Sequence, residues 1–131
     1  MLRKPPDPPR PTDAELEILN VLWRRGPSTV REVHEAVALR KPTQYTTVLK
    51  TMQIMADKGL LRRDEEQRAH IYEATRPREW TQRQLAGDLL RRAFSGSAKS
   101  LLLGALSAQR VSREELAELR KFLEEYEKGT P

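Results

Sequence analysis

The chain contains no cysteine, and only 5% of its 131 residues are aromatic. Without cysteine, a disulfide framework, a thiolate metal site and a cysteine nucleophile are all excluded. No apolar run approaches the ~20 residues that a membrane-spanning helix needs, and the first residues lack the apolar core of a signal peptide. We therefore expect a cytoplasmic protein that does not insert into a membrane.

Motifs for catalysis and metal binding are missing as well. His34-Glu35 begins like the zinc-binding pattern of metalloproteases, but Ala38 stands where the second histidine would lie one helical turn later. The other histidine, His70, is distant in sequence, and there is no glycine-rich phosphate loop or nucleophile elbow. We expect no catalytic residue, no metal and no cofactor, and a place for His34 on the surface or edge of a helix.

Basic residues are in excess, and the excess is concentrated in one segment. The whole chain has 24 Lys and Arg against 19 Asp and Glu, a net charge of +5. Between Arg24 and Arg63, nine basic residues stand against three acidic ones, so this segment alone carries about +6. Such a cluster favours a nucleic-acid partner, although a solvated surface is also compatible with it.

Residues 1–11 contain five prolines, which predicts an extended tail. Three helices should follow. Each begins at a threonine cap and ends at glycine or before proline, over residues 12–25, 29–41 and 43–58. Apolar spacing in the third helix predicts a buried face rather than a ligand pocket, formed by Tyr45, Val48, Met52 and Met55.

Two short strands are predicted over residues 60–63 and 68–74, joined by a charged loop at 64–67. A weak alternation suggests that Leu61, Ala69 and Ile71 face inward, with Tyr72 as a further candidate. Three helices followed by a hairpin is the order of a winged helix-turn-helix, here residues 12–75. The fold class is therefore mainly α with a small β-hairpin.

Residues 76–131 predict three more helices, which are too few to build a good core of their own. An apolar helical segment of this size usually packs against another domain or a second chain, so we expect a C-terminal helical dimerisation domain. The interface residues expected in it are Leu85, Leu89, Leu90, Phe94, Leu101, Leu102, Leu106, Leu119, Phe122 and Leu123.

The face of the third helix opposite its methionines is rich in small polar side chains. Hydroxyl and amide groups of this size can reach base edges or phosphates in a DNA major groove. The alternative interpretation of these side chains is an ordinary threonine-rich helix face that is exposed to solvent. The candidate residues are Thr43, Gln44, Thr46, Thr47 and Lys50.

Four blocks in this order resemble the penicillinase repressor family (BlaI, MecI and CopY). They are Thr12–Leu19 with Leu22-Trp23, Val30–Val33, Tyr45–Val48 and Lys58–Leu61. The resemblance implies a homodimeric winged-helix repressor that binds a palindromic operator, with Thr46, Thr47 and Lys50 in the major groove. It also implies that Thr43 and Gln44 lie at the phosphate-binding end of that helix, and that Arg68 follows the turn of the wing and reaches the DNA backbone or minor groove. For Arg68, a solvated charge on the hairpin is the alternative.

The chain departs from the family pattern at several positions. Ile54 stands where some members have arginine, and Glu65-Glu66-Gln67 replace the usual glycine of the wing turn. Copper sensing through C-terminal cysteines is excluded. In the penicillinase branch, a membrane sensor protease cuts an Asn-Phe bond that corresponds here to Gly104-Ala105, so we expect a protease of different specificity or another signal.

Two other functions stay open on these residues. The acidic wing and Ile54 fit a winged-helix adaptor that binds proteins and has lost DNA binding. A regulator that encloses a small ligand in its helical tail is the other alternative.

Overall fold

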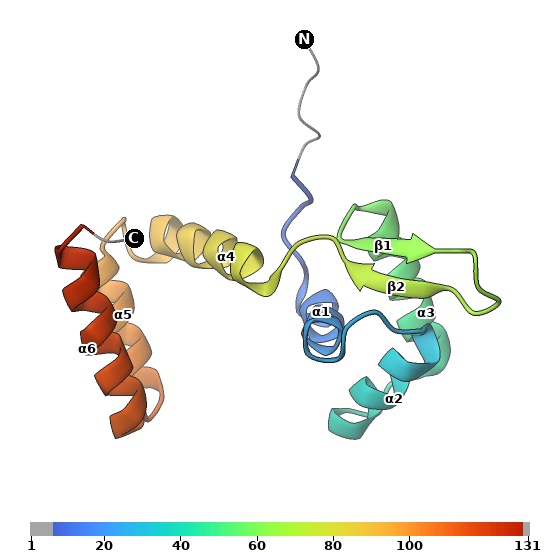
Figure 1. Ribbon diagram of the computed structural model, residues 1–131, viewed down its shortest axis with the longest axis horizontal. Helices are drawn as coiled ribbons and strands as arrows, with labels where there is room; N and C mark the ends of the chain where they lie inside the picture. The colour runs from blue at the N-terminus through green and yellow to red at the C-terminus, as the bar shows by residue number, and fades with distance from the viewer. Residues whose placement is uncertain (1–6, 130–131) are drawn as a thin grey trace, which may run out of the picture. The chain divides into compact units, whose positions relative to one another are not determined.

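The computed structural model describes residues 7–129, in which six helices and one two-stranded antiparallel sheet are found (Figure 1). The elements are α1 (Asp13–Arg25), α2 (Val30–Arg40), α3 (Tyr45–Asp57), β1 (Leu61–Asp64), β2 (Ile71–Ala74), α4 (Arg78–Ala93), α5 (Ala98–Ala108) and α6 (Arg113–Glu127). None of these helices is long and apolar enough to cross a membrane. The order and the hairpin confirm a mainly helical chain of the winged helix-turn-helix class.

The chain divides into two compact units, residues 1–86 and 87–131, with the division inside α4. The first unit therefore includes the beginning of α4 besides the predicted winged helix of residues 12–75. Thr81 in this part of α4 is buried, and the Trp23 indole donates a hydrogen bond to the Arg76 carbonyl (3.0 Å). Of the predicted N-terminal tail, residues 7–11 have no regular secondary structure and residues 1–6 lie outside the described part.

Two helices begin at the predicted capping boxes. Thr12 caps α1, where its hydroxyl accepts from the Glu15 amide and the Glu15 carboxylate accepts from the Thr12 amide (3.2 and 2.9 Å). Thr29 and Glu32 make the same reciprocal pair at α2. Each box satisfies backbone N–H groups that a helix start leaves without partners, which confirms both starts.

The predicted start of the third helix is wrong by one residue. Gln44, not Thr43, is the N-cap of α3, and its side chain makes no capping hydrogen bond. The Thr43 hydroxyl donates instead to the Lys41 carbonyl (2.9 Å). A threonine can hydrogen-bond a nearby carbonyl as readily as cap a helix, so the residue type alone does not locate the cap.

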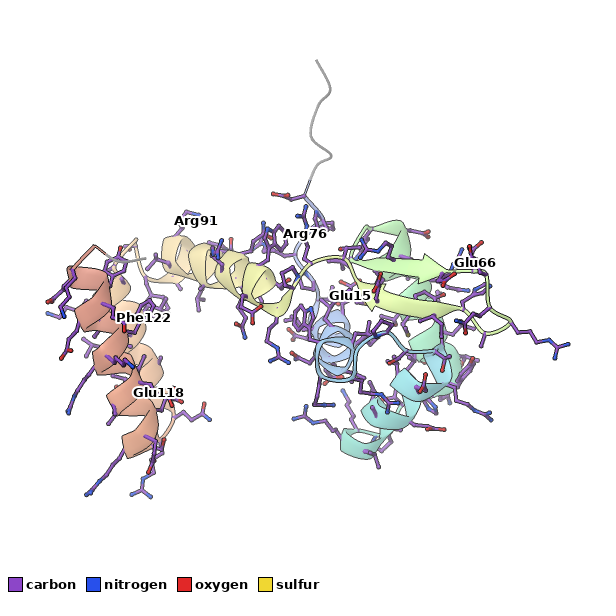
Figure 2. All side chains as sticks on the ribbon, in the orientation of Figure 1. Glu15, Glu66, Arg76, Arg91, Glu118 and Phe122 are labelled. Atoms are coloured by element: carbon purple, nitrogen blue, oxygen red, sulfur yellow. The ribbon has the colours of Figure 1, made fainter. Side chains whose placement is uncertain are left out.

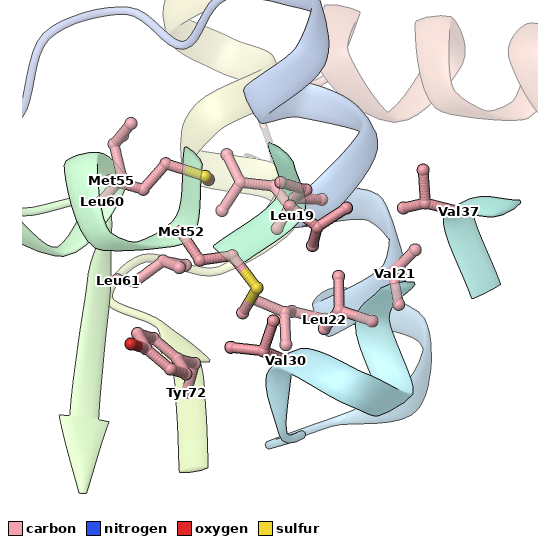
Figure 3. Packing of buried hydrophobic residues seen from close by; sticks show 13 residues of the cluster. Leu19, Val21, Leu22, Val30, Val37, Met52, Met55, Leu60, Leu61 and Tyr72 are labelled. Carbon is pink, nitrogen blue, oxygen red and sulfur yellow. The ribbon is translucent and has the colours of Figure 1, made fainter. Parts of the chain in front are cut away.

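One hydrophobic core joins α1, α2, α3 and the hairpin (Figure 3). Met52 of α3 lies between Leu22 of α1 and the hairpin residues Leu61 and Tyr72, and it is fully buried. The buried residues are Ile18, Leu19, Val21, Leu22, Val30, Val33, Val37, Val48, Met52, Met55, Leu60, Leu61 and Tyr72.

Tyr45 does not belong to this core, contrary to the sequence prediction. It is the first residue of α3 and 44% exposed, and its ring meets the edge of His34 (centroids 5.7 Å apart). Tyr45 has the apolar spacing of Val48 and Met52, but at the first turn of α3 the neighbouring elements leave its side chain partly in solvent.

The hairpin buries a different set of residues from the predicted one. Leu61 pairs with Ala74 and Arg63 with Tyr72 in the antiparallel register. Side chains of paired residues share a face and alternate along the strand, so Leu61, Arg63 and Tyr72 lie on the inner face and Ile71 on the outer one. Ala69 is exposed and lies before β2, so the predicted inward positions of Ala69 and Ile71 are wrong, whereas Leu61 and Tyr72 are buried.

A backbone bridge fixes Tyr72 of β2 to the loop between α1 and α2. Ser28 and Tyr72 exchange both of their backbone hydrogen bonds (2.9 and 2.8 Å), and Ser28 is buried. The hairpin is thereby attached to the helical core one residue from the end of β2 that adjoins its tip. Its tip, residues 65–70, is exposed throughout.

The second unit contains the end of α4 together with α5 and α6. Neither α5 nor α6 contains a buried residue within the described chain. The Phe94 ring packs against Gly104 of α5, where a methyl group in place of the glycine hydrogen would lie 3.4 Å from the ring. This unit has helices but no closed core.

Candidate nucleic-acid interface

The N-terminal half of α3 presents a polar face to solvent. Val48, Met52 and Met55 are buried on one side of the helix, so residues on the opposite side point outward by helical periodicity. Gln44, Thr46, Thr47 and Lys50 are all exposed, and Thr43 just before them is half-buried. The structure therefore brings together five of the six residues predicted to bind DNA.

The start of α3 offers backbone donors as well as side chains. The amides of Thr47 and Val48 donate to the Gln44 carbonyl (3.1 and 3.2 Å), but no side chain caps the first turn. An uncapped helix start leaves N–H groups directed at solvent, where the positive end of the helix dipole favours an anion. With hydroxyls on the adjacent turns, this end of α3 has the chemistry to hold a phosphate and reach base edges.

His34 of α2 supports the segment that leads into α3. Its Nε2 lies 2.7 Å from the Thr43 carbonyl oxygen. Because a carbonyl can only accept, Nε2 carries the proton and donates it. The half-buried His34 side chain thus lies at the helix edge as predicted, but its position beside Thr43 and Tyr45 depends on tertiary structure and has no signal in the sequence.

A basic groove of about 490 Å³ runs between α3 and the hairpin. Arg31 of α2, Arg63 of β1, and Arg68 and His70 of the hairpin loop line it, opposite Tyr45, Leu49 and Gln53 of α3. No carboxylate is among its lining residues. Arg68, the sixth predicted residue, is therefore close to α3. Arg31 and Arg63 were not predicted, because their places in the groove depend on how α2 and the hairpin pack beside α3.

A second hollow, of about 390 Å³, lies on the other side of the α3 start. Its lining includes the apolar Ile18, Val37 and Val48, which α1, α2 and α3 contribute, and the polar Gln44 and Thr47. Three of the candidate DNA-binding residues, Thr43, Gln44 and Thr47, therefore border a partly apolar depression.

Two acidic residues of the hairpin, Glu65 and Glu73, are paired with neighbouring arginines. Glu65 forms an ion pair with the Arg63 guanidinium, and Glu73 forms one with Arg62 on the outer face (3.0 Å). Interaction with the Tyr72 side chain and then with Glu65 raises the pKa of Arg63. Glu66, at the tip in Figure 2, donates its amide to the Asp64 carboxylate (2.9 Å). The wing therefore presents charges of both signs, and two of its carboxylates are paired with neighbouring arginines.

The ten residues expected at a dimer interface lie in α4, α5 and α6, and none of them is buried within the described chain. Phe122 is 60% exposed, Leu123 48%, Leu89 47% and Leu102 39%. Leu103 and Tyr126, which the sequence prediction omitted, are also exposed, and the rings of Phe122 and Tyr126 stack (centroids 6.3 Å apart). Phe122 projects from α6 in Figure 2.

Among residues 7–129, no three His, Cys, Asp or Glu side chains lie close enough to hold a metal ion together. The groove and the exposed face of α3 contain hydroxyl, amide, guanidinium and ammonium groups. These groups bind anions and the hydrogen-bonding edges of bases.

Comparison with known proteins agrees with this geometry. The chain is 37% identical over 119 residues to the transcriptional regulator BlaI of Mycobacterium tuberculosis, covering 89% of this chain and 85% of that protein. It is 26% identical over 118 residues to the penicillinase repressor of Bacillus licheniformis (90% and 92% covered), and 20% identical over 112 residues to the methicillin resistance regulatory protein MecI of Staphylococcus aureus (86% and 91%). The family model described as penicillinase repressor matches residues 11–125. The chain belongs to the penicillinase repressor family.

Proposed function

We propose that the chain is a transcriptional repressor that binds duplex DNA with α3 in the major groove. The observation that carries this proposal is the uncapped start of α3, whose exposed Gln44, Thr46, Thr47 and Lys50 stand next to a groove lined by three arginines. Major-groove reading needs small polar side chains on a helix that projects from a rigid core, together with nearby cations for the phosphates. The relatives named as a transcriptional regulator and as a penicillinase repressor support it.

The functional form in this proposal is a homodimer joined by residues 76–131. Apolar side chains on α4, α5 and α6 stay exposed in the single chain, and fully burying one stabilises by roughly 1.5–3 kcal/mol. A two-fold dimer places two copies of α3 on successive major grooves, which corresponds to a palindromic operator. DNA is then the partner, and the compartment is the cytoplasm.

Thr47→Ala and Lys50→Ala test the DNA-binding face. A duplex that the chain selects from a random pool serves as the specific target, with an unselected duplex for comparison. Loss of the Thr47 hydroxyl should reduce the preference for the selected duplex. Loss of Lys50 should weaken binding to both, and should lower the dependence of log K on log salt by about one if Lys50 contacts a phosphate.

Arg83→Ala is the matched control, because Arg83 is an exposed cation on α4 outside this face. It should leave both affinities close to those of the unaltered chain. Equal binding of the unaltered chain and both α3 variants to the two duplexes would contradict the proposal.

One observation favours an adaptor as the second candidate. Ile54 is 41% exposed on α3, beyond Lys50 on the same outward side, where a protein partner could bury it. In that case the chain binds neither duplex, and Ile54→Lys leaves DNA binding unaffected. The repressor proposal expects binding in the unaltered chain and tighter binding in this variant, because a cation there could reach a phosphate.

A further inference from the structure

We propose that Glu65 competes with DNA phosphates for Arg63. This acidic residue of the wing thereby makes the affinity for DNA of any sequence lower than it is when Arg63 has no carboxylate partner. The inference rests on the proposed function, since it assumes that DNA lies along α3 and the wing. It assigns roles to two residues that the family pattern of arginine after a glycine turn does not include.

Arg63 is directed toward the DNA-binding side of the wing by the register of the hairpin. It pairs with the buried Tyr72 and shares the inner face with Leu61, whereas Arg62 beside it faces outward and pairs with Glu73. The Arg63 side chain lines the same groove as Arg31 and Arg68. β1 thus fixes the backbone of Arg63, a residue that lines the basic groove.

Glu65 occupies the guanidinium that a phosphate would need. A carboxylate and a phosphate both bind the planar N–H fork of arginine, so the two compete for the same donors. The Arg63 side chain is 35% exposed and that of Glu65 is 59% exposed, so the pair lies in water and can exchange partners. The groove contains three arginines and no acid among its lining residues, so Glu65 is the acid that pairs with one of these arginines.

This competition predicts a specific pattern of binding. Phosphate contacts position a protein on DNA without reading its sequence. Releasing Arg63 from Glu65 should therefore raise the affinity for every duplex by the same factor, and leave the preference between duplexes unchanged. Changes on the reading face of α3, in contrast, alter that preference.

The test compares Glu65→Gln with Glu66→Gln, which removes the same charge one residue away. Within residues 7–129, no ion pair joins the Glu66 carboxylate to a cation. Binding is measured by fluorescence anisotropy on the selected and the unselected duplex across a salt series. Glu65→Gln should tighten binding to both about two- to fivefold and raise the salt dependence by about 0.9, the value for one phosphate contact. Glu66→Gln should have clearly smaller effects.

A double-mutant cycle separates competition from simple repulsion. In an Arg63→Gln background, Glu65→Gln should gain no more than Glu66→Gln does. In an Arg62→Gln background, it should retain its full effect, because Arg62 lies on the outer face. Thermal unfolding of every variant checks that the hairpin is intact, and if Arg63→Gln does not fold, the comparison of Glu65→Gln with Glu66→Gln decides.

Equal gains from Glu65→Gln and Glu66→Gln would overturn the inference, as would a gain from Glu65→Gln that survives Arg63→Gln. If Thr47→Ala and Lys50→Ala weaken binding while either of these results is found, only the role of Glu65 is wrong. If the α3 variants have no effect either, the proposed function fails with it.

Discussion

Glu15 and Lys58, 43 residues apart in the sequence, join the first turn of α1 to the end of α3. The Lys58 Nζ lies 2.9 Å from one Glu15 carboxylate oxygen, and the other oxygen accepts the Thr12 amide at 2.9 Å. The Glu15 side chain is only 4% exposed. One carboxylate thus completes the cap of α1 and holds the helix that carries the proposed DNA-binding face.

Glu15→Gln should lower the free energy of unfolding by about 1–2 kcal/mol. The amide oxygen can still accept from Thr12, but the charge that pairs with Lys58 is lost, and a buried charge pair is costly to break. This expected loss of stability is smaller than the loss on breaking a fully buried ion pair, because about a third of the Lys58 side chain is exposed. Urea unfolding measures it, with the exposed Glu17→Gln as a control that should change stability little.

The same contribution should depend on pH. Burial alone would raise the pKa of Glu15, but the hydrogen bond from the Thr12 amide and the contacts with Lys58 outweigh it, and the pKa falls below its ordinary value of 4.5. A carboxyl whose pKa is lower when folded stabilises fully above its unfolded pKa, and loses this effect as the pH falls through the folded pKa. The stability difference between the unaltered chain and Glu15→Gln should therefore be constant near neutral pH and shrink below about 4.5. A difference that grows on acidification would contradict it.

His34→Ala should weaken DNA binding although His34 lies behind the proposed contact face. The variant loses the hydrogen bond to the Thr43 carbonyl and the edge contact with Tyr45, which hold the start of α3. We expect a loss of severalfold on the selected duplex, because ordering this segment on binding then costs conformational entropy. Glu35→Ala, on the exposed neighbour, is the control and should bind like the unaltered chain.

Leu102→Asp combined with Leu106→Asp should convert dimers to monomers and greatly weaken operator binding. Both residues lie on α5, which has no buried residue in the single chain, so a charge there interferes with a partner rather than with a core. Light scattering gives the mass. Leu39→Asp is a matched control, because Leu39 is 87% exposed on α2 of the other unit. A dimer mass that persists in the double variant would place the interface elsewhere.

An activated sensor protease of the penicillinase branch should not cut between Gly104 and Ala105. The bulky aromatic of the family's cleavage site is absent here, and its loss costs several kcal/mol of transition-state binding in a pocket shaped for it. Both residues also lie inside α5, whose backbone must unwind before cleavage. Mass spectrometry of the fragments detects a cut. A single cleavage at this bond would mean that the protease reads something other than that side chain.

Local patterns in the sequence predicted much of the fold. The capping boxes at Thr12 and Thr29 each place a hydroxyl and a carboxylate three residues apart, so the start of the helix follows from neighbours along the chain. The buried apolar residues of α2, and those of α3 apart from Tyr45, were also predicted, because burial repeats with the helical period. Five of the six proposed DNA-binding residues come together for the same reason: they occupy one helix and the residues before it.

The features that were missed depend on contacts between elements. Tyr45 has the same apolar spacing as the core residues of α3, but it lies in the first turn of the helix and is partly exposed. The local sequence does not distinguish a buried residue at this spacing from an exposed one. The inner face of the hairpin combines Leu61 and Tyr72 with a charged residue, Arg63, which obscures its alternation. His34 and Arg31 acquire their places only when α2 packs beside α3 and the hairpin.

The bridge between Ser28 and Tyr72 also limits how copies of this chain can associate. Exposed strand edges are templates on which further strands add, and they lead to aggregation. Here each strand has only four residues. On the edge away from β1, β2 already exchanges backbone hydrogen bonds with Ser28. Three of the four residues of β1 are charged, namely Arg62, Arg63 and Asp64. The bridge to Ser28 therefore blocks the addition of a further strand at β2. The charged residues of β1 disfavour such pairing at the other edge. In the proposed dimer, association therefore depends on contacts between helix side chains, which are specific to each residue, whereas backbone pairing would accept almost any extended chain.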